Sequence, residues 1–170
     1  MSTNRRHFIG ALAATGATLT ATAGRASIEK LDLTKVKKET DVACLYHCDF
    51  GDPQRFGQLL NNINNHLTVY NYDTSKVKIV VVTHSAGIKF FLNDLSETPW
   101  EKERIDPELY NRFIALTKHG VEAYLCQITY TRLKVDPAKT REHASHKFVA
   151  SGVATVAELQ TKGFAYLKVG

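Results

Sequence analysis

Short β-branched runs and longer stretches with helical spacing alternate along most of the chain. The short apolar runs predict buried strands, at 42–47, 77–83, 121–126, 147–150 and 164–169. Apolar positions that recur every three or four residues predict helices, at 53–68, from Asp106 to Gly120 and at 152–162, with a short helix or turn at 88–95 and a loop or helical region at 134–146. This alternation favours an α/β fold, in which a mainly parallel sheet of about five strands is covered on both faces.

The first 26 residues have the pattern of a twin-arginine signal peptide. Arg5 and Arg6 precede the large apolar pair Phe8-Ile9, and a weakly apolar run rich in Ala and Thr follows. Small residues offer cleavage after Ala23 or Ala26. We therefore expect export to the periplasm with removal of the signal peptide, a polar linker over 27–40, and one folded domain over 41–170. The apolar run contains four Thr and two Gly, so no stable membrane anchor is expected.

Charge gives no sign of a nucleic-acid partner. The formal charge of the whole chain is +5, but three of the basic residues lie in the predicted signal peptide. The remainder carries 19 basic and 17 acidic residues, with no basic run or nucleic-acid-binding motif.

Three cysteines are the first indication of thiol chemistry, because an odd number leaves at least one thiol without an intramolecular partner. Cys44 and Cys48 lie four residues apart on one predicted strand, about 13 Å apart if that strand is regular, and cannot bridge each other. A disulfide between Cys48 and Cys126 across adjacent strand ends is possible and would give a dithiol redox site.

In a parallel sheet, ligands and reactive groups gather where the carboxyl ends of the strands meet. The residues that end the predicted strands form the candidate pocket: His47, Cys48, Asp49, His84, Ser85, Gly87, Cys126, Gln127, Ser151 and Gly152. Two thiols and two imidazoles at this edge suit a reactive cysteine, because a nearby imidazolium or helix start lowers a thiol pKa.

Four segments, in order, resemble the DsrE/DsrF-like sulfur-relay family. Residues 46–53 read YHCDFGDP and resemble its opening "YH-x-D-x-GDP", and residues 80–87 read VVVTHSAG and resemble "VV-x-HG-x-G". Residues 120–126 read GVEAYLC and resemble the "GV-x-F-x-VC" segment that holds the family's sulfur-bearing cysteine. The last segment, from Ser151 to Tyr166, resembles the family's closing "SGV" and "EL" pattern. The chain departs from the family at Ser85-Ala86, because the family more often has Gly directly after the histidine.

The resemblance implies a flavodoxin-like three-layer fold, assembly as a homotrimer or hexamer, and Cys126 as a persulfide carrier. It implies a sulfur donor or acceptor, either a protein or a small sulfur compound, as the partner. It does not fix whether the protein is an enzyme, and no cofactor is expected.

Alternatives stay open at each position. Cys126 is either the reactive thiol or a packed or bridged cysteine, and His84 either tunes that thiol or bonds a loop carbonyl. The family usually has an apolar residue at Cys48, which favours a core role. His143 and His146 have metal-ligand spacing but no third ligand nearby in sequence, so no metal site is expected. The function is thus a sulfur carrier or sulfurtransferase-like protein, with an oligomeric ligand-binding module or a Cys48–Cys126 dithiol protein as alternatives.

Overall fold

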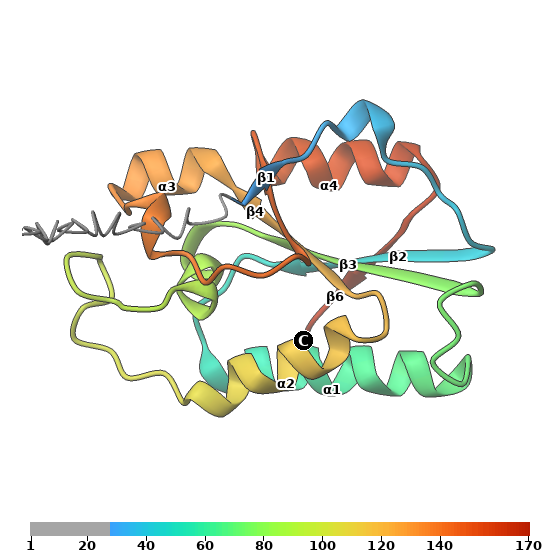
Figure 1. Cartoon of the computed structure of the whole chain (residues 1–170), viewed down its shortest axis with the longest axis horizontal. Coiled ribbons are helices and arrows are strands. Elements are labelled where there is room, and N and C mark those ends of the chain that lie inside the picture. Colours follow the sequence, from blue (N-terminus) through green and yellow to red (C-terminus); the bar gives the residue numbers. More distant parts are fainter. Residues whose placement is uncertain (1–27) are drawn as a thin grey trace, which may run out of the picture.

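Six parallel strands form the middle layer of the computed structural model, which describes residues 28–170 (Figure 1). Their order across the sheet is β1-β5-β4-β3-β2-β6. Their bounds are Glu29–Lys30 (β1), Val42–Cys48 (β2), Val77–Thr83 (β3), Glu122–Cys126 (β4), His146–Val149 (β5) and Ala165–Lys168 (β6). The predicted α/β class with a flavodoxin-like sheet is confirmed, with six strands rather than five.

Helices cover both faces of this sheet. The α-helices are Pro53–Val69 (α1), Pro107–Thr117 (α2), Gln127–Leu133 (α3) and Gly152–Thr161 (α4), and the 3₁₀ helices are Leu33–Lys35 (η1), Ser85–Phe91 (η2) and Pro137–Lys139 (η3). Figure 1 shows α1 and α2 together on one side and α3 and α4 on the other. No helix in the part of the chain from 28 to 170 is long and apolar enough to cross a membrane. The expected signal peptide lies outside the described residues.

Helix α1 forms where its sequence signals predict it. Asp52 is the N-cap and its carboxylate accepts a hydrogen bond from the Arg55 N–H at 2.7 Å, while Pro53 fits the first turn because it has no N–H to satisfy. One apolar stripe is buried against the sheet: Phe56, Leu59, Leu60, Ile63 and Leu67. This stripe anchors the loop between β2 and α1, which carries Asp49.

The sixth strand comes from the segment expected to be a linker. Glu29 and Lys30 pair with Lys147 and Phe148 of β5, and the Leu31 N–H donates to the Phe148 carbonyl at 2.8 Å. Val36 is also buried. Both residues of β1 are exposed, so this edge strand has no apolar alternation that would reveal it in the sequence. The folded unit therefore begins before residue 41.

The region after β4 also differs from the expectation. Helix α3 begins directly at the end of that strand, whereas a loop or helical region was predicted only from 134. Lys134 ends α3 in the left-handed conformation, with φ of 54°. This early helix carries Arg132, which lines the same cavity as Cys126 at the end of β4.

Candidate functional site

Strand alternation separates His47 from Cys48, because neighbouring side chains point to opposite faces of a sheet. Cys48 belongs to the apolar cluster that contains the buried stripe of α1. Leu45, two residues before His47, belongs to the cluster that contains Leu159 of α4. By the same alternation His47 and Cys126 occupy the α4 face.

His84 extends this face beyond the end of β3. Val80 and Val82 lie in the α4-side cluster, and His84 follows in extended conformation, with φ of −148° and ψ of −177°. Three candidate residues, His47, His84 and Cys126, thus share one face at the carboxyl edge of the sheet.

Cys126 lines a cavity of about 700 Å³ at this edge. The chain leaves β3 through η2, whose apolar residues join the α1-side cluster, whereas α3 after β4 lies on the α4 side (Figure 1). A crevice outside neighbouring strand ends is where α/β sheets bind ligands. The cavity is lined by His84, Ser85, Ala86, Pro99, Trp100, Cys126, Ile128, Thr129, Arg132, Leu133, Ser151 and Val153. Only 4% of Cys126 is exposed, so a reagent must enter this cavity to reach it.

Gly152 brings His84 and Cys126 close together. A Cβ on Gly152 would lie 2.9 Å from both Cβ and Cδ2 of His84, and 3.2 Å from Cβ of Cys126. Glycine is therefore required here by space rather than by a positive φ. Ser151 beside it caps α4, where its hydroxyl accepts a hydrogen bond from the Ala154 N–H at 3.3 Å.

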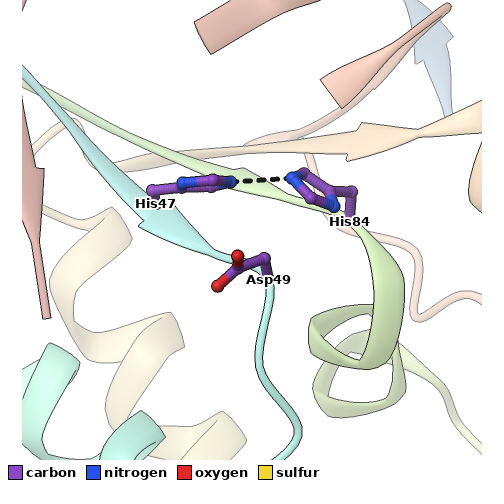
Figure 2. A group of neighbouring side chains, drawn as sticks. All are labelled: His47, Asp49 and His84. Atoms are coloured by element: carbon purple, nitrogen blue, oxygen red, sulfur yellow. Dashed lines mark hydrogen bonds between the residues drawn. The ribbon is translucent and has the colours of Figure 1, made fainter. Parts of the chain in front are cut away.

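The ring nitrogens of His84 are engaged by side chains. Nε2 lies 2.7 Å from Nε2 of His47, and Nδ1 lies 3.0 Å from the Ser85 hydroxyl. The other nitrogen of His47, Nδ1, lies 3.0 Å from the Tyr166 hydroxyl. Figure 2 shows the two rings facing each other, with the Asp49 side chain beside the line between them. The ligand atoms of His47, Asp49 and His84 all lie within 4.8 Å of one another, which is close enough for one metal ion.

The surroundings of both imidazoles favour the neutral form, because they lower both pKa values. Burial lowers the pKa of His47, and the charge of Arg55 lowers it further. Burial also lowers the pKa of His84, and the neighbouring His47 adds to that effect. The Asp49 carboxylate opposes both shifts without reversing them.

Ser85 adopts the backbone conformation that favours glycine, with φ of 50°. For a residue with a Cβ this left-handed conformation costs about 1 kcal/mol. The Ser85 N–H donates to the Thr129 hydroxyl at 3.0 Å, and its own hydroxyl contacts His84, so polar contacts offset the strain. This geometry explains why glycine suits the position after the histidine.

Cys48 lies in the core, away from the cavity. It has no exposed surface, and burial strongly raises the pKa of its thiol. A Cβ on Gly87 would lie 2.4 Å from the Cys48 carbonyl oxygen and 2.9 Å from its sulfur, so Gly87 serves this packing. All three cysteines are free thiols.

The idea of a Cys48–Cys126 bridge across adjacent strands is wrong for this fold. Strand β3 lies between β2 and β4, so the two backbones are about 10 Å apart. A disulfide needs Cα atoms within roughly 7 Å, and the intervening strand prevents that approach.

Some expected residues lie elsewhere. Gln127 lines a neighbouring cavity of about 350 Å³ with Tyr130 and Phe148. His146 is buried among aromatic rings, its Nδ1 lies 2.7 Å from the Arg141 carbonyl oxygen, and burial lowers its pKa to about 4. The ring of His143 lies 5.6 Å from that of His146, and its Nδ1 lies 2.8 Å from the Ser145 hydroxyl.

Three contributors were missed by sequence reasoning. Trp100 lies in a polar loop far from any strand end, and Arg132 lies on the helix that was not predicted. Tyr166 follows the family pattern, but only the pairing of β6 with β2 places it beside His47.

Comparison with known proteins agrees with the fold and the motifs. The model of the DsrE/DsrF-like family matches residues 41–169. A solved structure, of a protein of unknown function called MTH1491 from Methanobacterium thermoautotrophicum, is 24% identical with a TM-score of 0.59, covering 75% of this chain and 99% of that one. A comparison with curated proteins gave no match. Since the family model spans most of the chain, the protein belongs to the DsrE/DsrF-like family.

Proposed function

We propose that this protein carries sulfane sulfur as a persulfide on Cys126 and passes it to an acceptor thiol. The observation that carries the proposal is the position of this thiol, at the end of β4 in the wall of a cavity of about 700 Å³. Membership of the DsrE/DsrF-like family agrees with a role related to sulfur relay.

The transfer conserves atoms and electrons without an added oxidant. The Cys126 thiolate attacks the outer sulfur of a donor such as thiosulfate, a new S–S bond forms, and sulfite leaves with the electron pair of the broken bond. An acceptor thiolate then attacks the outer sulfur of the persulfide. The acceptor becomes a persulfide and Cys126 returns to its thiolate.

The lining of the cavity suits such donors. Arg132 supplies a positive charge that attracts anionic sulfur compounds. The hydroxyls of Ser85, Thr129 and Ser151 offer hydrogen bonds, and Trp100 supplies apolar surface for polarisable sulfur atoms. A thiol that is 4% exposed would also keep its outer sulfur away from bulk reductants.

We also propose that the protein works in the periplasm. Support comes from Arg5 and Arg6 ahead of a weakly apolar run. Replacing both by lysine should retain the protein in the cytoplasm, as measured by fractionation, whereas Lys37→Arg should not. Export of the double variant at the normal level would contradict this localisation.

The carrier function can be tested by intact mass analysis after incubation with thiosulfate or polysulfide. We expect an increase of about 32 Da, one sulfur atom, that is removed by a reductant. Cys126→Ala should abolish the adduct, and Cys48→Ala should keep it. If wild type forms no adduct while a cavity ligand raises the melting temperature, the cavity serves binding without thiol chemistry and the proposal fails.

A further inference from the structure

A cluster of three polar side chains lies at the border of the Cys126 cavity. The sulfur transfer described above does not use it. We propose that His47, Asp49 and His84 bind a divalent transition-metal ion, for which zinc is the best fit. Two imidazole nitrogens and a carboxylate oxygen are a donor set that Zn²⁺ uses in sites with an open fourth position. This inference does not depend on persulfide chemistry at Cys126.

The orientation of the two rings points to a shared ion. Nε2 of His47 and Nε2 of His84 face each other at 2.7 Å. Two Zn–N bonds of about 2.0–2.1 Å in tetrahedral geometry would separate the nitrogens by roughly 3.3 Å. The rings therefore need to move apart by only about 0.6 Å to admit the ion.

The Nδ1 atom of each ring has a hydrogen-bonding partner, as in known metal sites. Ligating histidines use the other ring nitrogen to donate a hydrogen bond, which fixes the tautomer and the ring orientation. Here Nδ1 of His47 lies 3.0 Å from the Tyr166 hydroxyl, and Nδ1 of His84 lies 3.0 Å from the Ser85 hydroxyl. Both hydroxyl oxygens can accept, so both Nε2 lone pairs can point at one ion.

Asp49 completes the set from the loop after β2. Its carboxylate oxygen lies within 4.8 Å of both ligand nitrogens, on one side of the line that joins them (Figure 2). Asp49 is exposed, while the two histidines are half-buried. The ion therefore has a route of entry from solvent and a negative charge to balance part of its own.

Metal-free hydrogen bonding is the competing explanation of the short contact. In that case one ring carries its proton on Nε2 and donates it to the other ring, and its Nδ1 must accept from a hydroxyl. Tyr166 and Ser85 would then have opposite roles, one donating and one accepting. The two explanations differ in whether Zn²⁺ binds and in which residues it needs.

Equilibrium dialysis of the full chain, without added histidines, against micromolar Zn²⁺ tests the site. We expect one ion per chain, and a loss of affinity of at least about 100-fold in His47→Gln or His84→Gln. Asp49→Asn and Tyr166→Phe should each weaken binding by about 10-fold. His119→Gln, whose ring packs on Tyr72, is the matched control and should bind as wild type does.

Several outcomes would overturn the site. One is a native protein that binds no Zn²⁺, and another is equal binding in His47→Gln and wild type. Cys126→Ser should keep the full metal content. If this variant binds less metal, the thiol is a ligand and the proposed site is wrong. Tyr166→Phe removes only one exposed hydroxyl and should fold normally. It therefore tests the site even if a histidine variant folds poorly. None of these readouts requires a persulfide, so this site and the carrier function can fail separately.

Discussion

Cys48 and Cys126 end two strands, β2 and β4, at the same edge of the sheet, yet their surroundings are opposite. Both are almost fully buried, at 0% and 4% exposure. Cys48 points into the core beneath α1, whereas Cys126 points to the other face and lines the cavity. The exposed fraction of a thiol therefore says little about its availability, and the face of the strand on which it lies decides between packing and chemistry.

Cys48 and Cys126 each have a glycine packed against them, and substitution of these two glycines should give the largest effects. Gly87→Ala would place a Cβ 2.4 Å from the Cys48 carbonyl oxygen, on strand backbone that cannot yield. We expect a loss of about 3 kcal/mol in the free energy of unfolding, measured by urea denaturation.

Gly152→Ala is the matched change on the other thiol. Its Cβ would lie 2.9 Å from Cβ of His84 and 3.2 Å from Cβ of Cys126, which are less severe contacts than 2.4 Å to a carbonyl oxygen, so the stability loss should be smaller, about 1–2 kcal/mol. Persulfide formation at Cys126 should slow instead. Equal destabilisation by the two substitutions would remove the contrast between a packed thiol and a cavity thiol.

The pH dependence of alkylation should also distinguish the thiols packed in the core, Cys44 and Cys48, from a reactive thiol. A raised pKa means that the thiolate appears only at higher pH than in an exposed cysteine. Burial raises the pKa of Cys44 and, more strongly, of Cys48. Iodoacetamide should therefore leave both unmodified in native protein from pH 6 to about 9, and label them fully after unfolding. Peptide mass analysis gives the result, and rapid native labelling of Cys48 would contradict its place in the core.

Arg132 allows a smaller and more specific test of the cavity. Arg132→Gln should slow sulfur transfer from thiosulfate by about 3- to 10-fold, because an anionic donor loses its attraction. Alkylation of Cys126 by neutral iodoacetamide should change little. Arg104→Gln, outside the residues that line the cavity, is the control. An equal loss with both reagents would mean that the substitution alters the shape of the cavity rather than its charge.

Ser85→Gly carries the smallest expected effect. Glycine removes the strain of a φ of 50° but also removes the hydroxyl that contacts His84. We expect a gain of about 0.5 kcal/mol in unfolding free energy, with native labelling of Cys48 unchanged. A loss of more than about 1 kcal/mol would show that the hydroxyl contact outweighs the strain.

Much of this arrangement was accessible from the sequence. The β-branched run of β3 predicted a strand, and the N-cap and apolar stripe of α1 predicted a helix. The rule that ligands gather at strand ends brought His84, Cys126 and Ser151 into one candidate pocket, and all three line the cavity. Local pattern suffices where burial alternates or recurs regularly.

The rest depends on pairings that no local pattern records. The two exposed residues of β1 join the sheet through backbone hydrogen bonds and the pairing with β5. Strand order placed β3 between Cys48 and Cys126, and it brought His47 beside His84 from the next strand. The sequence spacing of His143 and His146 gave no sign that His146 lies in the core, where it is buried among aromatic rings.

The most direct measurement is peptide mass analysis of the protein purified from its own cells, with thiols blocked at lysis to prevent exchange. We expect a persulfide on the peptide that contains Cys126, and unmodified thiols at Cys44 and Cys48. A Cys126 found only as the plain thiol, or an extra sulfur found on Cys48, would contradict the proposed carrier.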